Sequence, residues 1–321
     1  MSTNFSRNKN NGLLGVQASK GTQTVKDVAA LDLKVPVKFY SHPNGDLWIG
    51  DAVEWLRSLA SESVDLIFAD PPYNIKKAEW DTFESQQDYV DWSLVWLEQA
   101  ARVLKPTGTL YICGFSEILA DIKLPALRFF RGCRWLVWHY KNKANLGSDW
   151  GRSHESILHF RKNKQFTFNI DDVRTPYGEH TLKYPAHPQA ITSLYGKGRD
   201  DKGHIWQPHP NGAKPKDVLE IPTTCNGMHE KTAHPTQKPE ELLRQLVLAS
   251  SSIGDVVVDP FLGSGTTAVV AEQLKRKWQG CDKTLEYLQW SVQRIELVED
   301  WPIEKWIQYD RNNAERRKSI R

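Results

Sequence analysis

Two short motifs, each placed directly after an apolar run, constrain the fold of this 321-residue chain most strongly. The first is Asp-Pro-Pro-Tyr at residues 70–73, which follows the apolar residues 64–69. The second is Asp-Pro-Phe-Leu-Gly-Ser-Gly-Thr-Thr at residues 259–267, which follows a run of valines. Open α/β sheets bind their ligands outside the carboxyl ends of their strands. Both motifs are therefore candidate ligand-binding loops.

Strand-like and helical segments alternate along most of the chain. Pro106 and Gly108 are expected to end one of the helices. The alternation predicts an α/β fold with a doubly wound, mostly parallel sheet. The expected strands are residues 46–49, 64–69, 109–113, 135–140, 156–160, 255–259 and 278–282, and the expected helices are 52–59, 89–104, 240–249 and 268–274.

Three segments break this alternation. Residues 1–36 and 300–321 are basic, and residues 1–35 are also poor in apolar periodicity, so we expect a flexible N-terminal tail and a basic C-terminal tail. The tails are either solvated ends or contacts to phosphate, and the sequence leaves both readings open. Residues 161–233 are rich in Pro, Gly, His and Asn. A stretch this long within a compact domain is either functional or disordered, and its aromatic residues favour a function.

The composition is that of an ordinary globular protein, with 40% hydrophobic and 25% charged residues. No apolar run reaches the roughly 18 residues of a membrane span, and the first residues lack the apolar core of a secretory signal. We therefore expect a cytoplasmic protein without a membrane partner. The four cysteines lie far apart and none has a histidine at zinc-ligand spacing, which predicts reduced thiols and no metal site.

The second motif and two acidic residues outline a candidate nucleoside-binding site. Gly263 and Gly265 allow a tight turn and a close backbone approach to a ligand. The motif departs from the dinucleotide fingerprint because Ala268 stands where the third glycine would be. Asp282 ends the next expected strand, where an acidic residue typically bonds ribose hydroxyls. Asp51 either lies near the same ligand or caps the helix that follows it.

Together, these motifs resemble those of the β-group of bacterial DNA amino-methyltransferases, in which the catalytic motif precedes the cofactor motif. The resemblance covers roughly residues 45–298. It implies a seven-stranded S-adenosylmethionine-dependent methyltransferase sheet in permuted order. Residues 37–160 would form the catalytic half, residues 161–233 the target-recognition region and residues 234–299 the cofactor-binding half. The further matching segments are Gly50-Asp51, His154-Glu155, Gly280-Cys281-Asp282 and the sequence His-Pro-Thr-Gln-Lys-Pro at residues 234–239.

The resemblance implies methyl transfer to an exocyclic amino group of a base flipped out of duplex DNA. Such an amino group is a poor nucleophile because its lone pair is delocalised into the ring. The Asp70 side chain and the Pro71 carbonyl would accept its hydrogen bonds and aim the lone pair at the methyl donor. Pro71 and Pro72 would stiffen the loop, and Tyr73 would stack on the base. Read alone, the tetrapeptide also fits a proline turn with a packed tyrosine.

The resemblance also implies which residues hold the cofactor, S-adenosylmethionine. Residues 234–239 would help to bind its methionine end, and residues 259–267 would approach it through the backbone. The residues expected to bind the cofactor are Asp51, Asp70, His234, Thr236, Gln237, Lys238, Asp259, Pro260, Phe261, Gly263, Ser264, Gly265, Thr266, Thr267 and Asp282.

The target is less constrained than the reaction. In this family Asp at the first position of the tetrapeptide is commoner in adenine N6 enzymes and Ser in cytosine N4 enzymes, so adenine is favoured and cytosine is the alternative. Methylation of RNA or of a protein amide, and an inactive DNA-binding module, are further alternatives that the intact motifs disfavour. The expected partner is double-stranded DNA. A cognate restriction endonuclease system and a monomeric or homodimeric state stay open.

Basic residues of the irregular segment are the candidate DNA contacts, to phosphates or to base edges. Solvated loop charge is the alternative reading of the same residues. They are Arg174, Lys183, Lys197, Arg199 and Lys202.

Overall fold

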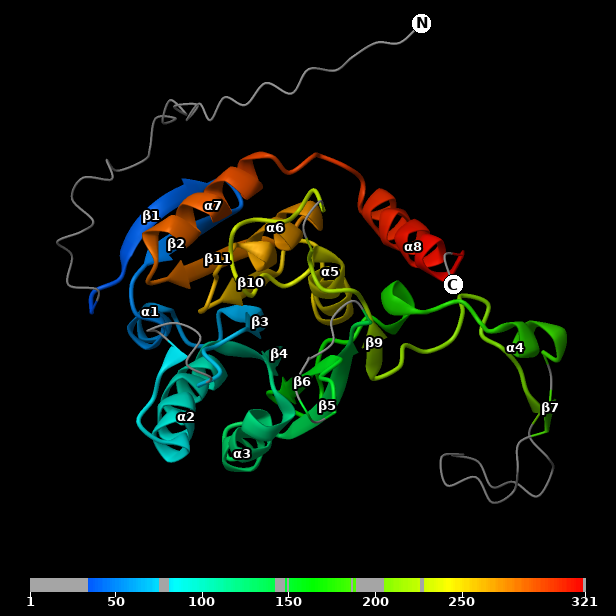
Figure 1. Ribbon diagram of the computed structural model, residues 1–321, viewed down its shortest axis with the longest axis horizontal. Helices are drawn as coiled ribbons and strands as arrows, with labels where there is room; N and C mark the ends of the chain where they lie inside the picture. The colour runs from blue at the N-terminus through cyan, green and yellow to red at the C-terminus, as the bar shows by residue number, and fades with distance from the viewer. Residues whose placement is uncertain are drawn as a thin grey trace, which may run out of the picture.

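The computed structural model describes residues 34–74, 81–141, 148, 150–185, 187–188, 205–225 and 228–319. Its centre is a nine-stranded sheet in the order β1-β2-β11-β10-β3-β4-β6-β5-β9, and β7 and β8 form a separate antiparallel pair (Figure 1). The strands are β1 (Val37–His42), β2 (Gly45–Ile49), β3 (Val64–Ala69), β4 (Leu104–Gly114), β5 (Gly132–His139), β6 (His154–Arg161), β7 (His187–Pro188), β8 (Ile205–Trp206), β9 (Val218–Glu220), β10 (Val256–Asp259) and β11 (Lys277–Asp282).

The five central strands of the large sheet, β2, β11, β10, β3 and β4, run parallel to one another. The flanking strand β1 is antiparallel to β2, and β6 is antiparallel to both β4 and β5. The predicted α/β fold with a mostly parallel sheet is therefore confirmed. The predicted number of seven strands is wrong, because β1 and β9 extend the sheet at its two edges. The three residues of β9 have no strand pattern of their own and are ordered by pairing with β5.

Helices cover both faces of the sheet (Figure 1). The helices α1, α2 and α3 pack in series on one face, and α5, α6 and α7 pack in series on the other. The side chains of strand β3 pack against both helical layers. Leu66 and Phe68 belong to one apolar core, whereas Ile67 and Ala69 belong to the other. The helices are α1 (Ala52–Ser58), α2 (Gln86–Val103), α3 (Ser116–Ala126), α5 (Glu240–Ser250), α6 (Thr266–Gln273) and α7 (Leu285–Glu296).

The C-terminal segment, which the sequence analysis describes only as a basic tail, forms a helix, α8 (Ile303–Ser319). Arg244 of α5 donates to Asp310 at 2.7 Å, and Arg317 donates to Glu241 at 2.6 Å. The Trp306 side chain is 8% exposed and lies under the Arg244 guanidinium. These tertiary contacts order a polar segment whose own sequence carries only a weak helical signal. Of the other predicted tail, residues 1–33 lie outside the described residues.

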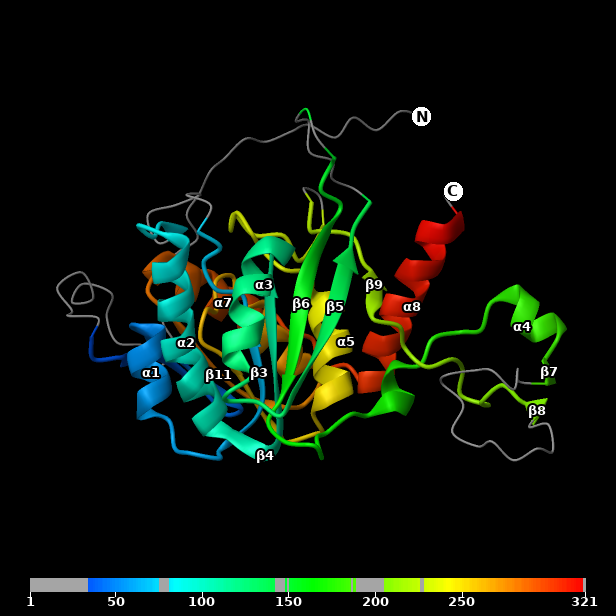
Figure 2. The same cartoon turned by 90° about the horizontal axis from the view of Figure 1, so that it is seen from below.

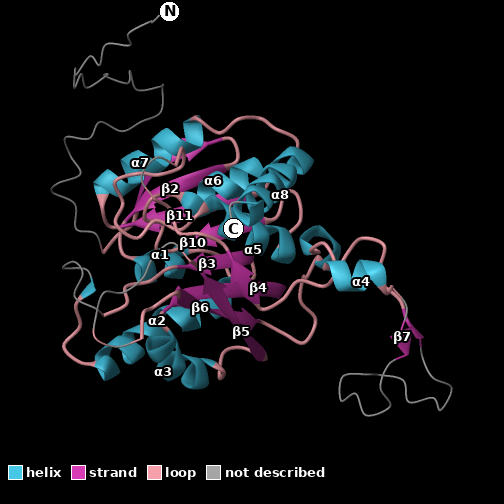
Figure 3. Cartoon of the chain, turned by 45° about the vertical axis from the view of Figure 1, so that its right-hand side comes forward, coloured by secondary structure: helices cyan, strands magenta, loops and turns pink. Residues whose placement is uncertain are grey.

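The irregular segment departs from the body of the molecule. It contains a 3-10 turn, Ile170–Val173, the short helix α4 (Glu179–Lys183) and the β7–β8 pair before it returns to the sheet as β9. In Figures 2 and 3, α4 and the β7–β8 pair project well away from the sheet. None of the described helices combines the length and the apolar character that a membrane crossing requires.

Candidate active site

The two sequence motifs meet where the winding of the sheet reverses. Strand β3 continues through α2 to β4 on one side, whereas its parallel neighbour β10 continues through α6 to β11 on the other. Asp70 follows β3 and Asp259 ends β10, so both lie at the carboxyl edge of adjacent strands. This border is the topological switch point at which doubly wound sheets bind their ligands.

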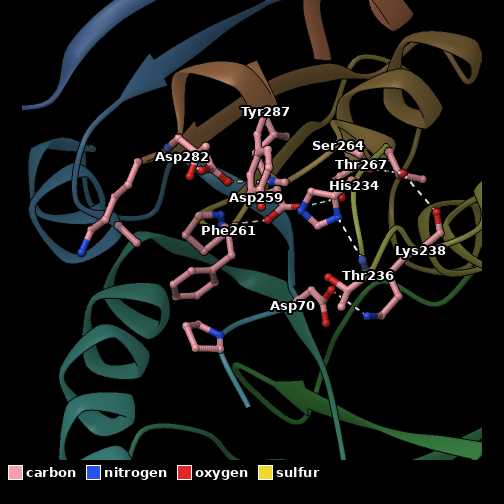
Figure 4. A pocket seen from close by; sticks show the side chains of 18 of the residues that line it. Asp70, His234, Thr236, Lys238, Asp259, Phe261, Ser264, Thr267, Asp282 and Tyr287 are labelled. Atoms are coloured by element: carbon pink, nitrogen blue, oxygen red, sulfur yellow. Dashed lines mark hydrogen bonds and ion pairs between the residues drawn. The ribbon is translucent and has the colours of Figure 1, made fainter. Parts of the chain in front are cut away.

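A cavity of about 280 Å³ lies at this point (Figure 4). All the expected cofactor residues line it except Gly265. Gly265 is instead the N-cap of α6, with a φ of +78°, and a Cβ there would lie 2.6 Å from Ser291. A glycine is therefore required at this position for the shape of the loop. In Figure 4, Asp282 and Lys238 approach the cavity from opposite sides.

Several lining residues escaped the sequence analysis. Phe83 and Trp92 form an aromatic wall with Phe261, with ring centroids 5.1 Å apart for the first pair and 5.8 Å for Trp92 and Phe261. Tyr287 packs edge-on against His234, with centroids 4.4 Å apart. The helix α7 that carries Tyr287 was not predicted. The only available signal was the run of aromatic residues in α2 and α7, which also fits a packed core.

Backbone amides and one hydroxyl hold Asp259 and Asp282 at the end of the cavity away from Lys238. Asp259 accepts from the Phe261 amide at 2.9 Å and from the Thr267 hydroxyl at 2.5 Å. Asp282 accepts from the amides of Gly263 and Thr284, both at 2.8 Å. Burial raises the pKa of both carboxyls, that of Asp259 to about 7. These bonds fix the two loops relative to each other.

Asp51 combines the two roles that the sequence left open. Its carboxylate caps α1 by accepting from the amides of Val53 at 2.9 Å and Glu54 at 3.2 Å. It also lines the cavity and pairs with Lys283 at 2.8 Å. Burial raises the pKa of Asp51, but Lys283 and the two amides outweigh burial and leave the pKa lowered.

Asp70 lies in a cluster of charged and polar side chains at the other end of the cavity. Its Oδ1 accepts from the Tyr73 hydroxyl at 2.6 Å, and its Oδ2 lies 2.6 Å from Nζ of Lys238. The Oε2 of Glu155, on β6, accepts from the Tyr73 hydroxyl at 3.1 Å and lies 3.4 Å from the same Nζ. The Cys113 thiol, on β4, also donates to this Oε2 at 3.4 Å. Four separate segments therefore converge on one cluster.

Electrostatics couples the members of this cluster. Burial raises the pKa of Asp70, and the neighbouring Lys238 opposes that rise. Burial lowers the pKa of Lys238, but Asp70 and Glu155 raise it by more, so the ammonium stays charged. Burial also raises the pKa of the Cys113 thiol, which stays protonated. The described lining residues include four aspartates and two lysines, and each lysine is paired with one of the aspartates, Lys283 with Asp51 and Lys238 with Asp70.

The tetrapeptide itself is firmly anchored. The buried Asp81 carboxylate accepts from the amides of Tyr73 at 2.5 Å and of Asn74 at 2.7 Å, and Asn74 holds a φ of +55°. The Tyr73 ring is 9% exposed and packs edge-on against Phe115, with centroids 5.0 Å apart. Asp70 and Pro72 line the cavity; Pro71 and Tyr73 are not among the described lining residues. The turn with a packed tyrosine is thus present together with the Asp70 cluster.

The segment 234–239 lies along the cavity, but its side chains differ in their environment. Gln237 donates to the carbonyl of Glu230 at 2.6 Å and accepts from the Thr232 amide at 2.8 Å, so its amide group holds the segment in place. Lys238 points to Asp70 (Figure 4). The described residues contain no group of three metal-ligating side chains.

The candidate DNA contacts are only partly described. The Arg174 guanidinium is mostly buried and is bound within the chain, to Asp171 at 2.6 Å and to the carbonyl of Gly212 at 2.9 Å. It holds the base of the projecting segment. Lys183 is exposed on α4, next to the Tyr184 ring. The remaining three, Lys197, Arg199 and Lys202, lie outside the described residues.

The chain is similar in sequence to a family of known proteins. A family model described as DNA methylase matches residues 64–293. The type II methyltransferase M1.MboII of Moraxella bovis is 34% identical over 249 residues, which cover 73% of this chain and 90% of that protein. The DNA adenine methyltransferase YhdJ of Escherichia coli (strain K12) is 34% identical over 260 residues, which cover 80% of this chain and 84% of that protein.

The fold comparison agrees with the sequence comparison. The solved structure of the PvuII DNA methyltransferase (cytosine-N4-specific) matches 85% of this chain and 93% of its own chain. The TM-score is 0.61 and the sequence identity is 22%. At this identity the likeness establishes the shared sheet and helix arrangement.

Proposed function

This chain belongs to the DNA methylase family, and from that membership we propose that it transfers a methyl group from S-adenosylmethionine to an exocyclic amino group of a base in double-stranded DNA. The observation that supports the proposal most directly is that one cavity contains both sets of predicted residues. The cavity that contains Gly263 and Asp282 also contains Asp70, so a ligand held at one end reaches the carboxylate at the other.

The shape and chemistry of the cavity fit S-adenosylmethionine. Gly263 has a φ of +54° and a Cβ there would lie 3.0 Å from Nε2 of His234, so only a glycine lets this loop pack against His234 beside the cavity. Asp282 would accept from the ribose hydroxyls, as acids at this place in doubly wound sheets do. Phe261 and Trp92 offer an apolar wall for the adenine. The excess of aspartates over lysines suits the positive sulfonium and amino groups.

The bound cofactor would supply a methyl group that is attached to a positively charged sulfur. After the transfer, this sulfur belongs to a neutral thioether. Asp70 and the Pro71 carbonyl would accept the two hydrogens of the target amino group, which turns the nitrogen lone pair out of the ring plane. The nitrogen would form a bond to the methyl carbon as the carbon–sulfur bond breaks, would carry a positive charge, and would then release one proton to water. Asp70 would stabilise that charge before the proton leaves.

Adenine N6 is the target that the sequence supports best, because Asp rather than Ser begins the tetrapeptide. The Escherichia coli relative carries the name of an adenine methyltransferase, which points the same way. Cytosine N4 is the second candidate, since it presents a similar amino group to the same carboxylate. We assign recognition of the DNA sequence to residues 161–233, because α4 and the β7–β8 pair project from the body of the molecule (Figure 2). The type II relative supports a place in a restriction-modification system.

One experiment tests the reaction and the base together. The purified protein is incubated with labelled S-adenosylmethionine and either duplex DNA, RNA or protein, and the nucleosides of the DNA are analysed by mass spectrometry. We expect label in DNA as N6-methyladenine. N4-methylcytosine would correct the base but keep the reaction, whereas label only in RNA or protein, or no label at all, would overturn the proposal.

A further inference from the structure

Both oxygens of the Asp70 carboxylate are already occupied by donors of this chain. The Tyr73 hydroxyl lies 2.6 Å from Oδ1, and the Lys238 ammonium lies 2.6 Å from Oδ2. The Lys238 side chain is only 6% exposed, so water cannot readily replace its carboxylate partner. In this arrangement the proposed acceptor of the target amino group is blocked by a charged side chain.

The blockage conflicts with the proposed function, on which this inference rests. Methyl transfer places positive charge on the amino nitrogen, and an ammonium bound to the same carboxylate opposes that charge. The sulfonium of the methyl donor is a second cation that approaches the same end of the cavity. The Lys238 ammonium must therefore leave Asp70. Because this ammonium is buried, it can move only to another hydrogen-bond acceptor.

The structure places such an acceptor within reach. The Oε2 of Glu155 lies 3.4 Å from the same Nζ, and it already shares the Tyr73 hydroxyl with Asp70. The ring of Trp138 lies 6.0 Å from Nζ and leaves an apolar, cation-tolerant surface along this side. A shift of Nζ by roughly 1 Å or less would exchange one carboxylate for the other.

We propose that Glu155 is a positioning residue: it takes the Lys238 ammonium from Asp70 when a cation arrives at the methyl-transfer end of the cavity. Lys238 then stays paired throughout, and Oδ2 of Asp70 becomes free for the target amino group. Glu155 contacts neither the cofactor nor the base in this proposal and acts through Lys238. Glu155, whose role the sequence left undefined, thereby acquires a function.

The exchange can be observed directly in the wild-type protein. We would determine its crystal structure with S-adenosylhomocysteine, which lacks the methyl group and the positive charge, and with sinefungin, which carries an ammonium in place of the methylated sulfonium. We expect Nζ of Lys238 closer to Asp70 in the first complex and closer to Glu155 in the second. Lys238 on Asp70 in both complexes would overturn the proposal.

Binding measurements with variants give an independent test. In Glu155→Gln the acceptor loses its charge, so we expect sinefungin to bind about tenfold more weakly relative to S-adenosylhomocysteine. Glu220→Gln, which changes an exposed carboxylate on β9, is the matched control and should leave the ratio of the two dissociation constants unchanged. With DNA, Glu155→Gln should lower kcat and should also raise the KM for S-adenosylmethionine, because the sulfonium carries the same positive charge as the ammonium of sinefungin.

A double-mutant cycle separates exchange from a plain charge effect. If Glu155 acts by accepting Lys238, the penalty of Glu155→Gln should vanish in the Lys238→Met background. An equal penalty in both backgrounds would mean that Glu155 acts only through its charge, and the exchange would be wrong. Failure of both compounds to bind the wild-type protein would refute the proposed function itself, a different result from binding without an altered ratio.

Discussion

The two ends of the cavity hold their carboxylates in different ways. At the cofactor end, Asp282 accepts from two backbone amides, and Asp259 accepts from one amide and one hydroxyl. At the catalytic end, Asp70 accepts only from side chains, Tyr73 and Lys238. Backbone donors are fixed by the strands and turns that carry them, whereas a lysine can change partners by rotation about its side-chain bonds.

The difference between backbone and side-chain donors fits two different functions, cofactor binding and admission of the target base. A cofactor site gains affinity from donors and acceptors that are already in place before binding. A site that must admit a flipped base has to free its acceptor at the right moment, and exchangeable side-chain donors permit that. The comparison predicts that mutations at the cofactor end change binding, whereas mutations at the catalytic end change turnover.

The largest expected effect is the loss of turnover in Asp70→Ala. Without the carboxylate, the amino group has lost one acceptor and the developing charge has lost its partner, so kcat should fall by about 10²–10³-fold. Cofactor affinity should change by no more than about threefold. Single-turnover methyl transfer and calorimetry measure the two quantities, and Asp121→Ala, at an exposed position on α3, is the control. Equal losses of turnover and cofactor affinity would break the distinction between the two ends.

The converse effect is expected in Asp282→Ala. The substitution removes the proposed ribose acceptor and the anchor for the amides of Gly263 and Thr284. We expect the Kd for S-adenosylhomocysteine to rise by about 10–100-fold. At saturating cofactor the kcat should recover to within about threefold of the wild-type value. Asp300→Ala, at a well-exposed carboxylate, provides the control, and an unchanged Kd in Asp282→Ala would remove this residue from the cofactor site.

The sequence indicated the residues that line the proposed cofactor end of the cavity more fully than the contacts around Asp70, for a physical reason. Asp282 and the loop of Gly263 act through local geometry, a strand end followed by a turn, which leaves a pattern in the sequence. The contact of Lys238 with Asp70 joins residues 168 positions apart and depends on the meeting of four segments. A contact between such distant residues leaves no periodic pattern in the sequence. Lys238 was therefore assigned to the cofactor alone.

Tertiary pairing also explains the errors in the fold. The segment around Asp310 was read as a tail because its sequence is polar, yet the buried Arg244 of α5 supplies the partner that orders it. Strand β9 has too few residues for an alternating pattern and exists through its register with β5. Arg174 was predicted to contact DNA, and its mostly buried guanidinium binds Asp171 and the Gly212 carbonyl within the chain. Each case needed a partner that the sequence does not identify.

A smaller effect, on stability, tests how rigid the cofactor end is. Gly265 and Gly254 both have positive φ, +78° and +83°, but only Gly265 has a close neighbour for an added Cβ. Gly254→Ala should therefore cost about 1 kcal/mol for its backbone conformation alone. Gly265→Ala should cost more than about 2 kcal/mol, because the Cβ also clashes with Ser291. Chemical denaturation measures both, and equal costs would show that the loop yields to the added methyl.

A last effect on stability is a pH dependence that arises from Asp259. Its pKa is raised by burial to about 7 in the folded protein, so between its ordinary range and pH 7 the folded state holds a proton that the unfolded state has lost. Stability due to this group is therefore present at low pH and is lost as the pH rises towards 7, at no more than about 1.4 kcal/mol per pH unit. Asp259→Asn, which keeps the shape of the side chain, should reduce this loss in unfolding free energies measured from pH 5 to pH 8. The exposed counterpart Asp300→Asn should follow the wild-type profile, and a profile of Asp259→Asn that also matches the wild type would mean that Asp259 stays ionised over this range.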